Sequence, residues 1–320
     1  MPRQAPSGAE LVTLAGSRPM LPMALGGSWY ATDAGDADRI GAMEAAFEAG
    51  IRHFDTGAGY AKGHSEELLG QFLAGKRDEV FVASKAHSDD LTPDAMLRQV
   101  EGSLRRLRVD VIDLYYIHWP RAGRDMRGPM EGLEQARRQG KIRAAGVSNF
   151  TVAQMQQVEE AGMIDAHQLG YNLLWRFAEQ DVIPHCAGQG IAVVAYSALA
   201  HGILTGKFGL EAHLDRADQR HTILPFRPDV WPAVHAGVER LKALAAANGL
   251  PLAALAIRWL LAQPHINSVV VGARDRAQSQ ANAAILDDGV SPAVLHEATK
   301  ISDEVASHIP DVGNLFDYYP

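Results

Sequence analysis

The chain has 320 residues, a formal net charge of −8 and one cysteine, Cys186. This acidic balance argues against nucleic acid or an anionic membrane as the main partner, and a lone cysteine excludes an internal disulfide. The N-terminal residues lack the apolar stretch of a signal peptide, and no apolar run is long enough to span a bilayer. We therefore expect a cytoplasmic globular protein whose partner is a small molecule. The sequence does not determine its oligomeric state.

Apolar runs at 11–15 and 20–25 predict an N-terminal β-hairpin. After it, helical and strand patterns alternate along the chain. Helices are predicted at 36–49, 65–73, 92–107, 128–139, 151–161, 180–187, 232–248, 252–262, 275–286 and 292–306. Strands are predicted at 51–54, 79–84, 111–117, 142–147, 166–169, 191–195 and 267–271. A connection at 201–227 is longer than loops usually are without a function.

About eight strand–helix units without a linker are typical of a (β/α)8 TIM barrel, an α/β fold, here with the hairpin as a cap. We expect one domain over residues 1–320. An open, doubly wound sheet would normally carry a G-x-G-x-x-G turn after its first strand, and the chain has no such motif.

Polar residues stand at or just past the ends of successive predicted strands. They are Asp55, Lys85, His118, Asn149, Gln168, Tyr196 and Arg274. In a closed parallel barrel these strand ends form one rim, so residues far apart in sequence converge there. A carboxylate at the end of a buried strand is costly unless it is paired. We therefore expect Asp55 to pair with Lys85 on the neighbouring strand.

Tyr60 lies on the turn just beyond Asp55. A free phenol has a pKa near 10, and a neighbouring ammonium such as Lys85 favours the phenolate and eases release of the proton. His118 can hydrogen-bond beside the same oxygen. This arrangement suits a general acid that protonates a carbonyl oxygen. Reduction also requires a hydride, and without a metal motif or a flavin signature we expect a nicotinamide cofactor.

Six stretches carry a resemblance to a known family: FDTGAGY ending at Tyr60, SEELLG at 65–70, ASK ending at Lys85, DLYYIHWP around His118, GVSNF around Ser148 and GILTGK at 202–207. In this order and at this spacing, the chain resembles the aldo-keto reductases from Leu11 to about Leu286. The resemblance implies a catalytic tetrad of Asp55, Tyr60, Lys85 and His118, with Tyr60 as the acid.

The resemblance also implies a cofactor site. It assigns Ser148, Asn149 and Gln168 to the nicotinamide carboxamide, Tyr196 to stacking on the ring, Ser197, Leu199 and Lys207 to the pyrophosphate, and Gly272, Arg274, Gln278 and Asn282 to the adenosine half. The family prefers NADPH, and Arg274 suits a 2′-phosphate. The family often has Glu before the asparagine matched by Asn282; Ala281 stands there instead, so NADH is also possible.

For the substrate pocket, the resemblance points to Trp29, His87, Trp119 and the tail near Phe316 or Tyr318. Polar His87 and Asp89 beside the rim favour a hydroxylated or anionic substrate. The leading hypothesis is a reversible NADPH-dependent reductase of aldehydes, ketones or aldoses. Two alternatives remain: a cofactor-binding regulatory subunit without useful turnover, and a Schiff-base lyase using Lys85, which a protonated Lys85 opposes.

Overall fold

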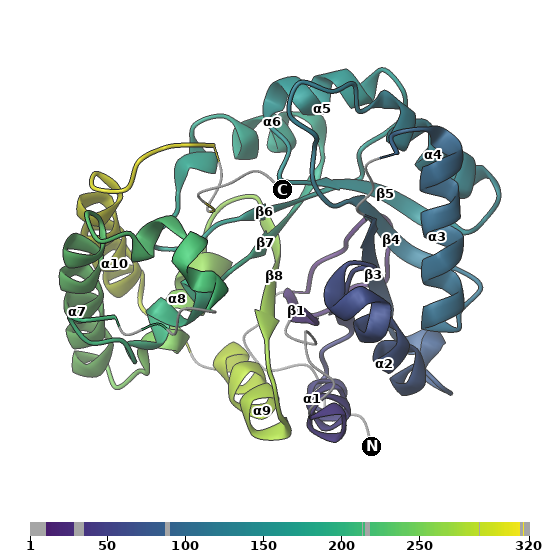
Figure 1. Cartoon of the computed structure of the whole chain (residues 1–320). Coiled ribbons are helices and arrows are strands. Elements are labelled where there is room, and N and C mark those ends of the chain that lie inside the picture. The colour runs from purple at the N-terminus through teal and green to yellow at the C-terminus, as the bar shows by residue number, and fades with distance from the viewer. Residues whose placement is uncertain are drawn as a thin grey trace.

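The computed structural model describes residues 11–28, 35–86, 90–212, 214, 218–287, 289–313 and 316. Eight parallel strands close into a barrel in chain order, with β8 joined to β1 and helices around the outside (Figure 1). The strands are β1 (Met23–Gly26), β2 (His53–Asp55), β3 (Phe81–Ala86), β4 (Ile112–Ile117), β5 (Ile142–Ser148), β6 (Ala166–Gly170), β7 (Ala192–Tyr196) and β8 (Ile266–Gly272). The predicted (β/α)8 barrel is confirmed.

The α-helices are α1 (Asp36–Glu48), α2 (His64–Phe72), α3 (Pro93–Leu107), α4 (Arg127–Arg138), α5 (Val152–Glu159), α6 (Val182–Gln189), α7 (Trp231–Ala247), α8 (Leu252–Leu261), α9 (Arg276–Ala284) and α10 (Pro292–Ala306). Short 3₁₀ helices are η1 (Tyr60–Gly63), η2 (Arg77–Glu79), η3 (Phe177–Glu179), η4 (Ala200–Thr205), η5 (Gln219–Thr222), η6 (Leu224–Phe226) and η7 (Ile285–Asp287). Three of these, η4 to η6, occupy the long connection after β7.

The barrel interior explains why the rim residues converge. Successive side chains of a strand point to opposite faces, so every second residue faces inward. Phe81, Ala83 and Lys85 are such a series in β3, and His53 and Asp55 are one in β2. In β3 the first two members are apolar and the last is charged, and in β2 a buried histidine precedes the charged residue. The interior apolar cluster consists of Leu14, Met20, Phe81, Ala83, Leu114, Tyr116, Ala144, Ala166 and Val194.

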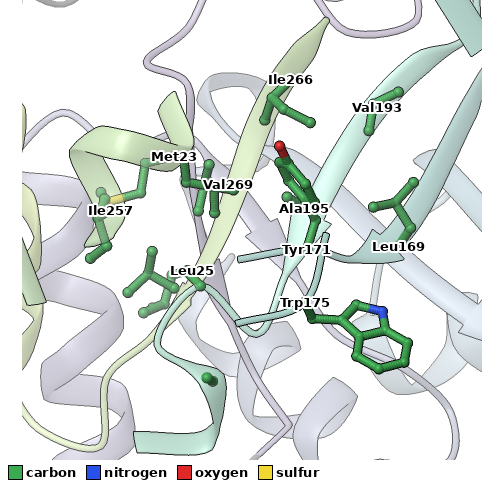
Figure 2. Packing of buried hydrophobic residues seen from close by; sticks show 14 of the residues in the cluster. Met23, Leu25, Leu169, Tyr171, Trp175, Val193, Ala195, Ile257, Ile266 and Val269 are labelled. Carbon is green, nitrogen blue, oxygen red and sulfur yellow. The ribbon is translucent and has the colours of Figure 1, made fainter. Parts of the chain in front are cut away.

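The outer faces of the strands pack against the helices in a second, larger cluster. Figure 2 shows part of it, where Met23 of β1 and Val269 of β8 lie near Ile257 of α8. The sequence of α8 is almost wholly apolar, and most of its residues are buried. In the described part of the chain no single helix is long and apolar enough to cross a membrane. Together, α7 and α8 reach that length and composition, but they are bent by 92° at their break.

The two N-terminal apolar runs have different roles. Val12 and Met20 form an antiparallel bridge, with N–H···O distances of 2.8 and 2.9 Å, and Met20 packs into the barrel interior. This bridge is the predicted hairpin. The rest of the second run was wrongly assigned to the hairpin, because it forms barrel strand β1. The change of role falls at Pro22, whose carbonyl accepts a hydrogen bond from Val269 N at 3.0 Å.

Helix starts follow the capping residues of the sequence. Thr92 and Thr151 cap α3 and α5, and each side chain accepts a hydrogen bond at 3.3 Å from the backbone N–H three residues later. The helix predicted at 180–187 begins two residues later than expected, because Asp181 caps it. The starts of α3, α5 and α6 are thus each marked by a single polar side chain.

A buried carboxylate ties three elements together behind the rim. Glu66 of α2 is fully buried and accepts hydrogen bonds from Ser84 Oγ of β3 and Arg106 Nε of α3, each at 2.6 Å. Gly70 permits the close approach of α2 and α3, because a Cβ there would lie 2.6 Å from the Arg106 carbonyl oxygen. Since Ser84 precedes Lys85, this network fixes the strand that carries the rim ammonium.

Replacing Glu66 by glutamine is expected to lower the free energy of unfolding by about 2 to 3 kcal/mol. The substitution keeps the shape but removes the charge that accepts two hydrogen bonds in a buried site. Chemical denaturation at neutral pH measures the change. Glu67→Gln is the matched control, because Glu67 is half exposed and its contact with His64 is 3.5 Å. Equal losses in the two variants would contradict this role of Glu66.

Candidate active site

The predicted ion pair lies at the carboxyl ends of β2 and β3. Lys85 Nζ donates to Asp55 Oδ1 and, at 2.9 Å, to the Thr56 carbonyl oxygen. The two side chains are almost completely buried, with residue exposures of 1% for Lys85 and 4% for Asp55. Removing either partner would leave a buried, uncompensated charge. The pair is therefore a fixed feature of the rim.

Tyr60 and His118 lie beside this pair. Tyr60 is the first residue of η1, and Lys85 Nζ lies 5.2 Å from the centroid of its ring. His118, just after β4, meets the same ring edge-on with a centroid distance of 5.6 Å. Both rings are partly exposed, whereas Asp55 and Lys85 are buried beneath them. The four residues predicted from the sequence are thus brought together.

The pKa of Tyr60 departs from the sequence expectation. Burial raises it above its usual value near 10, the Lys85 ammonium opposes this rise, and Asp55 adds to it. The expected lowering by Lys85 is thus outweighed by burial, and the phenol stays protonated at neutral pH. Burial disfavours the charge on Lys85, but Asp55 and Tyr60 outweigh it, so the pKa of Lys85 is raised.

A second group of predicted residues forms a hydrogen-bonded chain on the rim. Tyr196 Oη donates to Asn149 Oδ1 at 2.7 Å, and Asn149 Nδ2 donates to Ser148 Oγ at 3.0 Å and to the His118 carbonyl oxygen at 3.2 Å. Asn149 has a φ of 66°, which is unusual for a residue other than glycine. These hydrogen bonds hold the conformation of Asn149 and join the ends of β4, β5 and β7.

Gln168, at the carboxyl end of β6, lies deeper than these residues. Its Nε2 donates to Asp55 Oδ2 at 2.8 Å, and it is 3% exposed. The two oxygens of Asp55 are therefore held by different partners, Lys85 and Gln168. In the described structure the amide of Gln168 thus orients the ion pair. The sequence placed Gln168 beside the cofactor and did not predict this contact.

The loop after β7 contains the residues predicted for the pyrophosphate. Ser197 and Leu199 are partly buried at its start, and Lys207 is exposed just after η4. Burial, together with the positive charges of Arg220 and Arg274, lowers the pKa of Lys207. Arg220 and Arg274 thus lie near enough to Lys207 to act on its charge, and Asp218, which pairs with Arg220, partly offsets them. Positive side chains in this loop fit the phosphates of a dinucleotide. Arg220 was not singled out from the sequence, where only its place in the long connection pointed to it.

The segment predicted for the adenosine half begins at the end of β8. Asn282 Nδ2 donates to the Gly272 carbonyl oxygen at 2.9 Å, and Gln278 Oε1 accepts from Arg274 N at 3.1 Å. Asp275 caps α9 by accepting from Gln278 N at 2.8 Å. These bonds fold residues 272–282 into a compact unit with the Arg274 side chain in solvent, 69% exposed.

On the substrate side, Trp119 is partly buried next to His118, with a ring-centroid distance of 6.3 Å. Phe316 of the C-terminal tail lies edge-on to Trp119 at 5.7 Å and edge-on to His201 at 5.7 Å. The other predicted pocket residues, Trp29 and His87, lie outside the described residues, as do Asp89 and Tyr318.

Two buried residues near the site were missed in the sequence. His53 lies inside the barrel two residues before Asp55, and Asn172 lies beneath the loop after β7. Neither belongs to a short motif with a known chemical role. Alternation along β2 places His53 on the inward face with Asp55, which is the signal that sequence reasoning had available.

The closed parallel barrel gathers a carboxylate, an ammonium, a phenol and an imidazole at the carboxyl ends of its strands, the end at which enzymes of this fold class carry their active sites. The sequence model of the Aldo/keto reductase family matches residues 22–303, and the chain belongs to that family of oxidoreductases. The resemblance stated from the motifs is confirmed.

Four relatives illustrate the match. Aldo-keto reductase YhdN of Bacillus subtilis (strain 168) is 34% identical over 274 residues, 82% of each chain. NADH-specific methylglyoxal reductase of Escherichia coli (strain K12) is 29% identical, over 81% of this chain and 86% of its own. The glycerol dehydrogenase AKR11B4 from Gluconobacter oxydans superposes with a TM-score of 0.82 at 32% identity, over 94% and 96% of the two chains. A Klebsiella pneumoniae aldo-keto reductase in complex with NADPH gives 0.76 at 26% identity, over 97% and 99%.

Proposed function

We propose that this protein is an NADPH-dependent carbonyl reductase that also catalyses the reverse alcohol oxidation. The observation that carries the proposal is the buried Lys85 ammonium, which is bonded to Asp55 and lies beside the Tyr60 phenol. A fixed ammonium at a phenol stabilises the phenolate that remains after the proton has left. A structural ion pair would not need a partly exposed phenol beside it.

In this mechanism Tyr60 is the general acid that protonates the carbonyl oxygen. Lys85 stabilises the resulting phenolate, and Asp55 holds Lys85 charged and in position. His118, edge-on to the Tyr60 ring, hydrogen-bonds the carbonyl oxygen and orients it. Bound NADPH supplies the hydride. The raised pKa of Tyr60 keeps the proton on the acid at neutral pH until the carbonyl oxygen accepts it.

The cofactor is proposed to lie across the rim. Tyr196 would stack on the nicotinamide, with Ser148 and Asn149 at its carboxamide and Gln168 behind them. Ser197, Leu199 and Lys207 would hold the pyrophosphate, and the segment with Gly272, Arg274, Gln278 and Asn282 the adenosine half. The exposed guanidinium of Arg274, which acts on the charge of Lys207, favours a ligand with an additional phosphate, and hence NADPH over NADH.

The substrate is proposed to be a short, oxygenated aldehyde or ketone. The relatives named above include a methylglyoxal reductase and a glycerol dehydrogenase. Trp119 and Phe316, packed edge-on, would border the pocket beside His118. The aromatic rings would contact the carbon chain while Tyr60 and His118 bind the carbonyl oxygen.

A turnover assay tests this function. Purified protein is mixed with NADPH or NADH and methylglyoxal, glyceraldehyde, a simple ketone or an aldose, and loss of reduced-cofactor absorbance is followed. Turnover that is faster with NADPH and with the three-carbon substrates is expected. Tight NADPH binding with negligible turnover of the whole panel would favour a regulatory subunit instead. Trapping of a substrate on Lys85 by borohydride would favour the lyase.

Replacing Arg274 by alanine is expected to raise the KM for NADPH by about tenfold to a hundredfold and to change the KM for NADH less than about twofold. Charge-assisted bonds to a phosphate account for a loss of this size, and NADH has no 2′-phosphate. Steady-state kinetics with both cofactors measures it. Arg276→Ala is the matched control, because Arg276 lies two residues away and pairs with Glu48 at 2.7 Å. Equal effects on the two cofactors would remove Arg274 from the phosphate site.

A further inference from the structure

The turn that follows β7 has a backbone conformation that most residues avoid. Ser197, directly after Tyr196, has a φ of 57°, and Ala200 and His201 have φ values of 45° and 55°. Non-glycine residues keep left-handed conformations only where their surroundings fix them. The groups that contact Ser197 are therefore the ones that shape this turn.

A side chain from the neighbouring strand end holds the turn. Asn172, two residues after β6, is 1% exposed, and its Nδ2 donates to the Ser197 carbonyl oxygen at 3.0 Å. The same oxygen accepts from Ala200 N at 2.7 Å. On its other side, Asn172 Oδ1 accepts from Leu174 N at 2.8 Å. Both ends of the amide are thus used, and its orientation is fixed.

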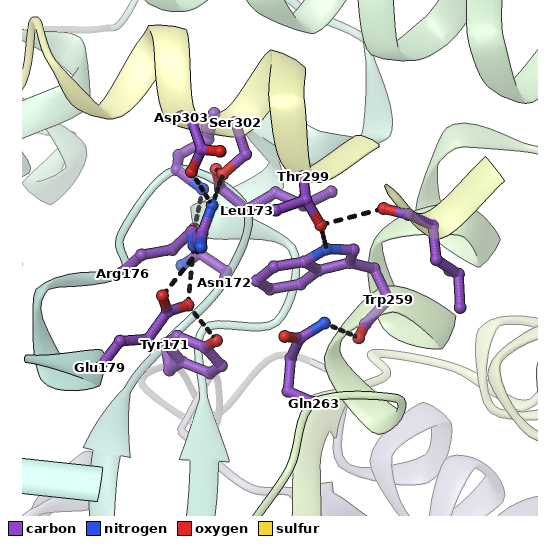
Figure 3. Close-up of polar contacts among 12 residues, drawn as sticks. Tyr171, Asn172, Leu173, Arg176, Glu179, Trp259, Gln263, Thr299, Ser302 and Asp303 are labelled. Atoms are coloured by element: carbon purple, nitrogen blue, oxygen red, sulfur yellow. Dashed lines mark hydrogen bonds and ion pairs between the residues drawn. The ribbon is translucent and has the colours of Figure 1, made fainter. Parts of the chain in front are cut away.

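The segment that carries Asn172 is itself firmly anchored. Its backbone N and O pair with those of Trp175 at 3.1 and 3.0 Å. Figure 3 shows Arg176 lying between Glu179 and Asp303 of α10, with bonds of 2.7 and 2.5 Å. Ser302 of α10 donates to the Leu173 carbonyl oxygen at 2.5 Å. Asn172 therefore extends from a rigid support to a strained turn.

We propose that Asn172 is a positioning residue of the cofactor site, acting through the Ser197 turn; this inference rests on the proposed function. The carbonyl of Ser197 and the N–H of Ala198 belong to one trans peptide and point in opposite directions. By binding the carbonyl, Asn172 directs the N–H away from itself, to the side where the pyrophosphate is proposed to lie. Backbone N–H groups oriented in this way bind phosphate oxygens.

The turn also carries the ring proposed to stack on the nicotinamide. The Tyr196 carbonyl oxygen accepts from Tyr171 N at 3.3 Å, and Ser197 Oγ bonds His201 Nε2 at 3.0 Å. Asn172 follows Tyr171 in the sequence and binds the carbonyl oxygen of Ser197, the residue after Tyr196. Loss of its amide donor leaves the Ser197 carbonyl with the bond from Ala200 N, so the peptide between Ser197 and Ala198 should be held less tightly, which weakens cofactor binding without touching the reacting atoms.

The test compares three variants of the full-length protein. Asn172→Leu removes both side-chain hydrogen bonds at similar size, and Asn172→Asp replaces the donor that faces Ser197 by a carboxylate oxygen while keeping the acceptor for Leu174 N. Tyr171→Phe is the control: it keeps the ring and removes a bond of 2.5 Å to Glu179 in the same segment, away from Ser197. Measurements are the Kd for NADPH by fluorescence, kcat at saturating NADPH, and the melting temperature.

Both Asn172 variants are expected to raise the Kd for NADPH by roughly tenfold, with kcat at saturation within about twofold of the wild type. Tyr171→Phe should lower the melting temperature about as much as the Asn172 variants do, and it should leave the Kd for NADPH unchanged. If Asn172→Leu does not fold, Asn172→Asp decides the question. An unchanged Kd in the Asn172 variants, or an equal rise in Tyr171→Phe, overturns the proposal. A wild-type protein that does not bind NADPH would instead overturn the proposed function.

Discussion

Replacing Tyr60 by phenylalanine is expected to lower kcat for carbonyl reduction by roughly a thousandfold, while the protein still folds and binds NADPH. The variant differs from the wild type only in lacking the hydroxyl group, which is the proposed general acid. General acid catalysis contributes about a hundredfold to ten-thousandfold to a rate. Steady-state turnover with the best carbonyl substrate, together with the Kd for NADPH, measures the two effects separately.

The control for Tyr60→Phe is Tyr115→Phe. Tyr115 is fully buried on the outer face of β4, where its hydroxyl bonds Ser103 Oγ at 2.8 Å. This variant also loses one phenol hydrogen bond but has no contact with the rim, so its kcat should stay near that of the wild type. If Tyr60→Phe retained most of its rate, Tyr60 would not be the acid and the mechanism proposed above would be wrong.

The raised pKa of Tyr60 predicts opposite pH dependences for the two directions of the reaction. Reduction requires the protonated phenol, so its kcat should stay level through neutral pH and fall only in the alkaline range. Oxidation of an alcohol requires the phenolate, so its kcat should rise as the pH approaches the raised pKa. Replacing Lys85 by methionine should move both profiles to higher pH, because the ammonium opposes the rise. Profiles that do not move would separate Lys85 from Tyr60.

The rim was predictable from the sequence because two simple rules act together. Strands in a parallel barrel end at one rim, and every second residue faces inward, so the polar residues that end predicted strands, such as Asp55 and Lys85, converge. Neither rule requires knowledge of side-chain packing. The same reasoning failed for β1, where one apolar run, 20–25, serves both the hairpin bridge and the barrel.

The remaining features depend on quantities that a sequence does not contain. The direction of the Tyr60 pKa shift is decided by the balance of burial against the Lys85 charge, and burial is known only once the fold is built. The bond from Asn172 to Ser197 joins residues 25 positions apart in a region without a motif. The partnership of Glu66 and Arg106 spans 40 positions. Such contacts follow from the packing of whole elements.

Acid is expected to destabilise this protein through its buried histidines, two of which, His53 and His167, lie inside or against the barrel. Burial lowers the pKa of His53 to about 4 and that of His167 to about 3. In the unfolded chain each has a pKa near 6.5. Between these values the unfolded chain binds more protons than the folded chain, so stability is fully present above about pH 6.5 and falls as the pH is lowered.

The physical reason is that a protonated histidine carries two N–H groups, and neither buried ring has acceptors for both. His53 Nδ1 faces Ser268 Oγ at 3.3 Å, its ring packs on Phe81, and Asp55 only partly offsets the cost of charging it beside Lys85. His167 Nε2 accepts from Phe150 N at 3.1 Å, a bond that protonation at this nitrogen breaks. Among the described residues, His53 Nε2 and His167 Nδ1 have no hydrogen-bond partner.

Urea unfolding at a series of pH values measures the effect. Between about pH 7 and about pH 4.5 the two histidines together should remove about 5 kcal/mol, roughly half from each, a large share of a typical stability of about 5 to 15 kcal/mol. His53→Asn and His167→Gln each place an amide where the bonded ring nitrogen lies, and each should remove its own share of the loss, about 2.5 kcal/mol. His201, whose pKa burial also lowers to about 4, keeps its own contribution to the slope in both variants. His308→Gln, at an exposed position, is the control for replacing a histidine by an amide. If neither buried variant flattened the slope, other groups would cause the acid sensitivity. The inference that His53 and His167 are uncharged in the folded protein would then be wrong.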